Sequence, residues 1–223
     1  MKPIPIISVV IIVALFMKYC KKDEDNAIKD YDGNIYTSVA IGTQVWMIEN
    51  LKTSHFNNGT AIPLITDGTA WSNLGTPGYC WYNNDGAANK DTYGALYNWF
   101  TVSTGNLCPK GWHVPSQEEW AALATYLGGD HAAGNKLKEA GSTHWQSPNT
   151  GADNSSGFTA LPGGYRYDND VFEWITINGF WWSSTYAYGE RSYSRELDIE
   201  YSDFFVFNDP KKAGFSVRCL KDN

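Results

Sequence analysis

The segment that organises the chain is residues 108–129, which read CPKGWHVPSQEEWAALATYLGG. Ser116 and Glu119 are placed to form a capping box, in which a hydroxyl and a carboxylate satisfy the free N–H groups that begin a helix. Pro115 precedes this box, and Gly128-Gly129 supplies a stop signal. Between them, apolar side chains recur at helical spacing, at Trp120, Leu123, Ala124 and Leu127. The segment therefore predicts an amphipathic helix that follows Ser116 and ends at Gly128.

Strands are predicted on both sides of this helix. Upstream, Ile35 to Ile41 and Gln44 to Met47 alternate around the turn Gly42-Thr43, which is the pattern of a hairpin. Downstream, the predicted strands are Phe158 to Leu161, Gly164 to Tyr167, Phe172 to Ile177, Gly179 to Ser183, Ser194 to Ile199, Phe204 to Phe207 and Phe215 to Leu220.

Two further helices are expected between the strand sets. Aromatic and apolar residues between Tyr93 and Phe100 recur at helical spacing and predict a helix over 92–102, and a second is expected over about 131–140. Turn residues dominate 52–90 and 142–156, which we expect to be long irregular loops. Helices inserted between strand sets favour an α+β domain with a twisted antiparallel sheet.

The composition fits one globular domain outside the cytosol. The chain has 223 residues, of which 43% are hydrophobic and 15% aromatic, while only 18% are charged. This balance favours a loop-rich extracellular module. The net charge is −7, and no cluster of Lys and Arg interleaves with the aromatic residues, so the phosphate-neutralising contacts of nucleic-acid binding are missing. We therefore exclude a nucleic-acid partner.

The first nineteen residues have the features of an export signal. Lys2 is followed by an apolar stretch from Ile6 to Met17 that is too short for a stable membrane span, so residues 1–19 are expected to be a signal peptide. Cys20 then precedes a charged run, which resembles a lipoprotein signal in which Cys20 is acylated. Lys18-Tyr19 is bulkier than the small residues usual before such a cysteine. A plain signal peptide with an unmodified Cys20 is therefore the alternative.

The residues after Cys20 are expected to tether the domain to a membrane. Residues 20–29 are mostly polar and lack aromatic side chains, and Lys22-Asp23-Glu24 resembles the acidic export tag of surface lipoproteins in Bacteroidetes-type bacteria. We expect an exported chain at the outer membrane or cell surface, held there through its lipid. The folded domain is expected to span 30–223.

Three cysteines remain after Cys20, and in an oxidising compartment two of them can pair. We expect a disulfide between Cys108 and Cys219, because Cys108 closes a polar loop ahead of the helix and Cys219 lies in the terminal strand. Closing so long a loop stabilises a fold by roughly 4 to 5 kcal/mol on the chain-entropy model. Cys80 is then either a buried small hydrophobe or a reactive thiol, and its aromatic neighbours favour burial.

Six ordered blocks of sequence carry a resemblance to a known family. They are Asp32-Gly33-Asn34, Gln44 to Leu51, Tyr93 to Trp99, Cys108 to Pro115, Leu161 to Arg166 and Gly214 to Cys219. Over about 30–221 the chain resembles the Fibrobacter succinogenes major paralogous domain family. The resemblance implies a C-type-lectin-like fold, close to the domain of formylglycine-generating enzymes, in exported lipoproteins.

The resemblance implies little chemistry. Formylglycine-generating enzymes use a pair of nearby cysteines, whereas the matching terminal block here supplies only Cys219, so we expect no enzyme activity and assign no catalytic residue. The calcium-binding blocks of related lectins do not occur here, and no cofactor is expected. Asp168 and Asp170 place oxygen ligands at alternate positions and are weak candidates for calcium, although such runs are usually turns.

The histidines receive no catalytic role. His113 lies just before the capped helix, and we expect a packed imidazole bonded to backbone rather than a catalytic base. His55, His131 and His144 occur in polar contexts without a Ser or Cys nucleophile motif around them.

Aromatic residues near the C-terminus form the candidate ligand site. Adjacent strand residues face opposite sides, so Trp181 and Trp182 cannot both enter one core face. Together with Tyr186, Tyr188 and Arg191 in the loop expected to follow, Trp182 could bind a sugar or peptide. The alternative is that helices or long loops cover the second face.

Three functions follow from these observations. The leading hypothesis is a noncatalytic surface module that binds glycans or an envelope protein. The second is an oxidoreductase related to formylglycine-generating enzymes, which would need a free reactive thiol. The third is a structural subunit of a surface assembly, which would self-associate.

Overall fold

The computed structural model describes residues 27–223, so the predicted signal peptide and Cys20 lie outside the described part of the chain. Its elements in chain order are β1 Ile28–Lys29, β2 Ile35–Tyr36, β3 Ser38–Ile41, β4 Gln44–Met47, α1 Gly68–Ser72, β5 Tyr79–Cys80, η2 Tyr82–Asn84, α2 Gly86–Tyr93, β6 Leu96–Tyr97, α3 Trp99–Val102, β7 Trp112–His113, α4 Gln117–Tyr126, α5 Asp130–Leu137, β8 Gly163–Arg166, β9 Phe172–Ile175, β10 Asn178–Tyr188, β11 Arg191–Asp198, β12 Phe205–Pro210 and β13 Leu220–Lys221.

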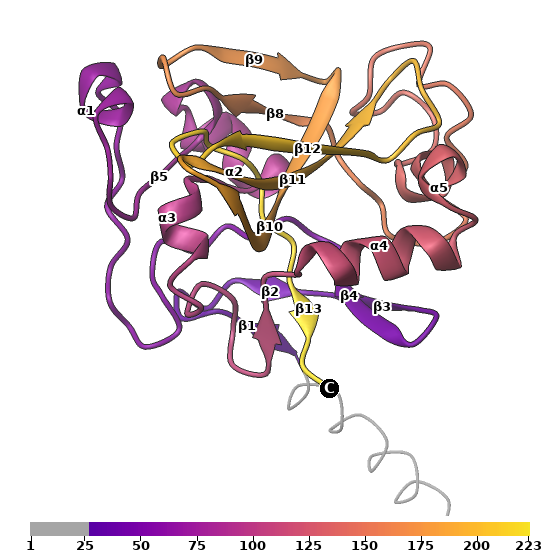
Figure 1. The fold of residues 1–223 in the computed structure, drawn as a ribbon, viewed down its shortest axis with the longest axis horizontal. Coiled ribbons are helices and arrows are strands. Elements are labelled where there is room, and N and C mark those ends of the chain that lie inside the picture. Colours follow the sequence, from indigo (N-terminus) through magenta and orange to yellow (C-terminus); the bar gives the residue numbers. More distant parts are fainter. Residues whose placement is uncertain (1–26) are drawn as a thin grey trace, which may run out of the picture.

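The domain is α+β, as the sequence predicts. A five-stranded sheet has the order β12-β11-β10-β8-β9, and a four-stranded sheet has the order β3-β4-β13-β7. All neighbours in these sheets are antiparallel except β8 and β10, which run parallel through the pair Gly164 and Gly179. Figure 1 shows β8 and β9 at the end of the molecule opposite to β1, β2 and β13.

The capped helix is confirmed. The Ser116 hydroxyl accepts from the Glu119 N–H, and the Glu119 carboxylate accepts from the Ser116 N–H at 2.7 Å, which completes the capping box of α4. Trp120 and Leu123 are fully buried beneath this helix. The predicted hairpin forms as β3 and β4, and the helix expected near 131–140 is α5.

The helix predicted over 92–102 is wrong. Gly94 adopts a φ of 78°, which ends α2, and Leu96 and Tyr97 instead form β6 beside β5. Asn98 then accepts a hydrogen bond from the Thr101 N–H and begins the short helix α3. Tyr97 is buried in the core, but it points there from a strand and not from the face of a helix.

One predicted strand is absent and another is much shorter than expected. Phe158 to Leu161 forms no strand, and Phe215 to Leu220 contributes only Leu220 to β13. Between Phe215 and Cys219 the backbone bonds to a different neighbour at each step, including Tyr97, Phe180 and Met47. This terminal segment therefore passes between the two sheets and ties them together without lying along either one.

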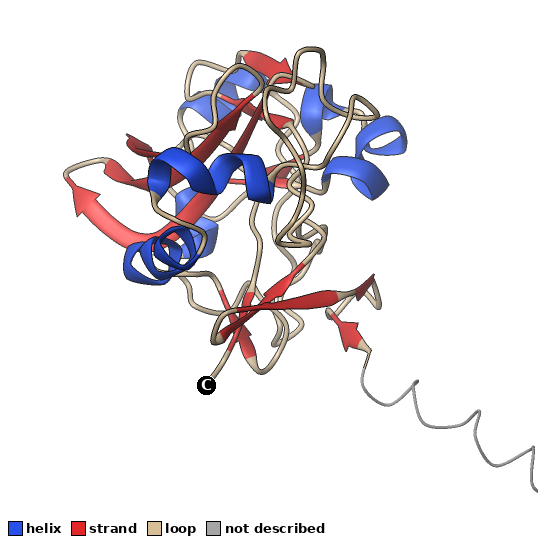
Figure 2. Cartoon of the chain, turned by 90° about the vertical axis from the view of Figure 1, so that its right-hand side faces the viewer, coloured by secondary structure: helices blue, strands red, loops and turns tan. Residues whose placement is uncertain are grey.

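The expected disulfide is present between Cys108 and Cys219, whose Cα atoms lie 6.0 Å apart. It joins the loop before β7 to the residue before β13, across 111 positions of sequence. Figure 2 shows the four-stranded sheet at the same end of the molecule as the first described residues. The covalent link therefore closes that end of the domain.

Candidate functional site

Trp182, proposed from the sequence to present a stacking ring, does not reach the surface. It is 0% exposed, packs 4.5 Å from the ring of Phe215 and donates its indole N–H to the Tyr97 carbonyl. Trp181 is equally buried, on the other side of β10, in a separate cluster of core residues. The prediction was wrong because both faces of this strand are covered, which was the alternative considered.

Tyr186, Tyr188 and Arg191 lie on β10 and β11 and not in a loop. The Tyr188 hydroxyl donates to the Asn208 side chain, and the guanidinium of Arg191 donates to the Asn208 backbone carbonyl at 2.6 Å. The ring of Tyr186 lies 4.7 Å from the Lys211 ammonium. The polar groups of Tyr188 and Arg191 are thus engaged with β12, although both tyrosine rings remain exposed.

The structure places a different set of side chains around a small pocket. This Trp174 pocket has a volume of about 240 Å³ and is lined by Trp174, Ile177, Asn178, Asp198, Ile199 and Glu200. It lies where β9 turns into β10 and where β11 ends, and Asn178 and Asp198 are paired across β10 and β11. A ring, an amide and two carboxylates from separate segments therefore meet in one place.

Asn178 is the distinctive residue of this pocket. Its side-chain NH₂ donates to Glu196 at 2.5 Å and to Asp198 at 2.9 Å, which fixes the orientation of the amide. The amide oxygen, Oδ1, has no partner among residues 27–223, although the residue is only 1% exposed. An unpartnered buried acceptor costs stability, and a donor that reached it from the pocket would remove that cost.

Behind Asn178 lies the carboxyl group of Glu196, whose pKa is shifted into the neutral range. Burial, together with the neighbouring carboxylates Asp198 and Asp209, raises the pKa of Glu196 to about 7 against the lowering effect of the Asn178 amide. The side chain is therefore partly protonated near neutral pH. Apart from the indole N–H of Trp174, the polar side chains that line the pocket offer hydrogen-bond acceptors, namely Asn178 Oδ1, Asp198 and Glu200.

Trp174 is held in an uncommon backbone conformation. Its φ is 65°, and that of Thr176 is 68°, in the left-handed region that bulky and β-branched residues rarely adopt. The ring packs 5.8 Å from Tyr165 and 6.3 Å from Phe180, yet 46% of the residue stays exposed. The strained turn therefore keeps a large ring at the rim of the pocket.

Asp168 and Asp170 occupy the turn between β8 and β9. The Asp170 carboxylate accepts from Arg166 at 2.9 Å and 2.5 Å, so its charge is already paired with a buried guanidinium. No group of three or more His, Cys, Asp or Glu side chains in residues 27–223 is arranged to hold a metal ion. The observed role of Asp170 is that of a turn residue bonded to Arg166.

The free thiol of Cys80 is buried. The residue is fully enclosed, and burial raises the pKa of its thiol to about 12. This confirms the interpretation of Cys80 as a small core residue. Such a thiol is protonated at neutral pH and is a poor nucleophile.

His113 does not bond to backbone, and that expectation was wrong. Its two ring nitrogens face the carboxylates of Asp222 and Glu119, at 2.7 Å and 2.9 Å. These carboxylates raise the pKa of His113 against the opposing effect of burial. The imidazole therefore links the C-terminus to the start of α4 as an ion pair.

A larger pocket lies at the other end of the molecule. It has a volume of about 690 Å³, and its lining includes Ile28, Lys29, Pro109, Lys110, Trp112 and Lys221. We call it the Trp112 pocket. Its first strand, β1, falls within the stretch that the sequence analysis assigned to the tether, so the ordered domain begins earlier than residue 30.

The comparison with protein families matches a region that contains five of the six sequence blocks, from Gln44 to Cys219. The chain belongs to the Fibrobacter succinogenes major domain family, whose model matches residues 39–221. No curated protein and no solved structure matches the chain. No helix among residues 27–223 is long and apolar enough to cross a membrane.

Proposed function

We propose that the chain is a noncatalytic glycan-binding module, displayed at the cell surface on a lipid anchor, with its ligand in the Trp174 pocket. The observation that carries the proposal is the buried and unpartnered Oδ1 of Asn178 beside the exposed ring of Trp174. A hydroxyl of a sugar would donate to this oxygen while the ring covers an apolar face of the sugar.

The charge of the pocket narrows the class of glycan. Asp198, Glu200 and Oδ1 of Asn178 all accept hydrogen bonds, so the ligand must supply donors. Neutral sugars and amino sugars meet this requirement. Sugars that carry a carboxylate or sulfate are disfavoured, because their charge would lie beside Asp198 and Glu200. The volume of about 240 Å³ suits one sugar ring or the end of a chain.

The proposed export route is inferred from the sequence before residue 27. A signal peptide over 1–19 and acylation of Cys20 would hold the domain at the outer membrane or cell surface. The disulfide between Cys108 and Cys219 supports this address, since such bonds persist outside the cytosol. Mass spectrometry of the membrane fraction should find a diacylglyceryl group on Cys20, and an unmodified soluble product would contradict the anchor.

The finer fold assignment is a C-type-lectin-like domain. Support comes from membership of the family, from the long loops between short elements, and from the terminal segment that ties the two sheets together. The state of the cysteines supports a noncatalytic role within this fold. Cys219 is held in the disulfide and Cys80 is buried, so neither offers the reactive thiol that an oxidoreductase of this type needs.

A glycan array tests the proposed site. The wild-type chain is compared with Trp174→Ala and with Tyr126→Ala, which removes a more exposed ring on α4, outside the pocket. We expect binding to neutral or amino sugars that is lost in Trp174→Ala and kept in Tyr126→Ala. Full binding by Trp174→Ala, or signals confined to acidic sugars, would overturn the proposal. Thermal melting of each variant checks that the fold is intact.

One observation favours a second function, that of an assembly subunit. Among the described residues β12 pairs only with β11, so it forms an edge of the five-stranded sheet, and Val206 and Phe207 on it are exposed. Such an edge is a template for strand addition. Analytical ultracentrifugation should then show self-association that Val206→Lys abolishes, and a monomer at all concentrations would exclude it.

A further inference from the structure

We propose that the Trp112 pocket and its lysine rim form the face that the domain lays against an anionic lipid surface. This inference rests on the lipid anchor proposed above, and it assigns a role to the end of the molecule that the glycan site leaves unused.

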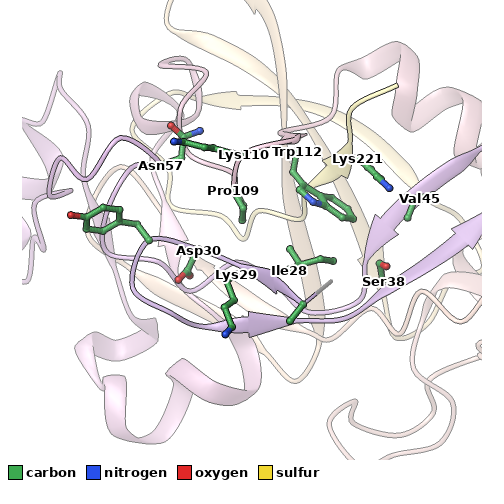
Figure 3. Close-up of a pocket in the computed structure, with 12 residues that line it drawn as sticks. Ile28, Lys29, Asp30, Ser38, Val45, Asn57, Pro109, Lys110, Trp112 and Lys221 are labelled. Carbon is green, nitrogen blue, oxygen red and sulfur yellow. The ribbon is translucent and has the colours of Figure 1, made fainter. Parts of the chain in front are cut away.

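The pocket combines an apolar centre with a cationic rim. Figure 3 shows Trp112, Pro109 and Ile28 in the middle of the pocket, with Lys29, Lys110 and Lys221 around them. The rings and aliphatic groups of such a surface enter the headgroup region, while the ammonium groups meet the phosphates of anionic lipids. A small buried anion would instead call for lysines that converge at the centre.

Exposed apolar side chains continue this surface onto the N-terminal hairpin. Tyr31, which also lines the pocket, is 60% exposed, and Ile35, paired with Lys29 across β1 and β2, is 59% exposed. Large side chains this exposed on a short ribbon gain stability when an interface covers them. Aromatic and cationic residues occur together in this way at membrane interfaces.

The nearby carboxylates are already engaged. Asp30 is buried and accepts hydrogen bonds from the Tyr36 hydroxyl at 2.6 Å and from the Asn34 amide at 2.7 Å. Asp222, next to Lys221, faces His113. The lining of the pocket therefore holds three exposed lysines against the one buried carboxylate of Asp30, in a chain whose net charge is −7. An anionic lipid surface repels the negatively charged rest of the domain and attracts the lysine rim. The domain would therefore be oriented with the Trp112 pocket towards the lipid.

The predicted anchor brings this end to the membrane. Ala27 lines the pocket and follows Cys20 by seven positions in the sequence. Seven residues span at most about 25 Å when fully extended. A lipid chain combined with a basic patch is also a known way to strengthen membrane attachment. β9, which carries Trp174, lies at the far end and would face outward (Figure 1).

Lysine acetylation read by mass spectrometry tests the proposal in the exported full chain. The chain is reconstituted with vesicles of phosphatidylcholine alone or with added phosphatidylglycerol, and each lysine serves as its own reporter. We expect the labelling rates of Lys29, Lys110 and Lys221 to fall at least threefold on the anionic vesicles alone. Lys90 and Lys212, which lie on α2 and beside α1, should label equally on both.

A further arm separates a lipid surface from a free phosphate. Soluble glycerol phosphate should leave the three lysines as reactive as buffer does, and protection by it alone would overturn docking in favour of a small anion site. Equal labelling on both kinds of vesicle would also overturn the proposal. A chain that fails to sediment with neutral vesicles would show a missing anchor, and glycan binding through Trp174 is scored separately.

Discussion

The two ends of this domain each present a tryptophan in a pocket, but the charges around the rings are opposite. Trp112 is surrounded by Lys29, Lys110 and Lys221, whereas Trp174 shares its pocket with Asp198 and Glu200. An aromatic ring alone selects no ligand class, because lipids and sugars both offer apolar faces. The difference teaches that the charged and hydrogen-bonding groups around the ring decide between a lipid surface and a sugar.

The largest expected effect concerns the end of the domain that holds the Trp112 pocket. It tests how much the disulfide at this end stabilises the fold. Cys108→Ser with Cys219→Ser should lower the free energy of unfolding by about 4 to 5 kcal/mol, because the unfolded chain gains the entropy of a long open loop. Denaturant unfolding measures this loss, and Cys80→Ala serves as a control without a disulfide. An unchanged midpoint in the double variant would mean that noncovalent packing alone closes this end.

The next largest effect concerns the end of the domain that holds the Trp174 pocket. Trp174→Ala should weaken binding of an array-selected sugar by about 10- to 100-fold, since a stacked ring contributes roughly 1 to 3 kcal/mol. Stability should change little, because the ring is half exposed. Isothermal titration calorimetry measures the affinity, and Trp174→Phe should recover part of it. A variant with unaltered affinity would move the ligand site away from this pocket.

Glu196 gives the outward end a pH dependence. Its folded-state pKa of about 7 lies above the unfolded value of about 4.3, so the folded chain binds the extra proton between these limits. The stability that this proton confers is present at low pH and is lost as the pH rises through 7.

Glu196→Gln should remove this dependence and stabilise the domain at pH 8 by about 2 kcal/mol, with little change at pH 5. Thermal melts from pH 5 to 8 measure the slope, and the exposed Glu200→Gln is the matched control. The same slope in Glu196→Gln and wild type would show that Glu196 is ionised throughout.

The smallest effect is expected at the residues first selected from the sequence. Tyr188→Ala should change sugar affinity less than twofold, because its hydroxyl is bonded to Asn208 and the ring is remote from the Trp174 pocket in the register of β10. Calorimetry with the same sugar checks this. A tenfold loss would return the site to the hairpin of β10 and β11.

Local signals predicted the fold where they act within one segment. The capping box fixed α4. The disulfide was also predicted, although it joins distant segments and Cys219 lies just before β13. The predicted helix over 92–102 failed because pairing of Leu96 with Cys80, a contact between segments, outweighed the helical spacing. The Phe215 to Cys219 segment likewise depends on several distant partners.

The candidate site could not be predicted for the same reason. Asn178 precedes Gly179 and has the sequence signature of a turn, and nothing in the sequence indicates that it bonds to Glu196 on the neighbouring strand β11. Strand register decides which side chains meet, and register is a property of the assembled sheet. The clue available was weaker: a tryptophan in a short strand followed by two closely spaced acids at Glu196 and Asp198.

Hydroxyl-radical footprinting of the exported chain tests the division between the two ends most directly. Oxidation of Trp112 and Trp174 is measured with phosphatidylglycerol vesicles and, separately, with a sugar selected on the array. We predict that vesicles protect Trp112 and leave Trp174 reactive, and that the sugar does the reverse. Protection of both rings by one reagent, or of neither ring by its assigned reagent, would contradict the assignment of separate ligands to the two pockets.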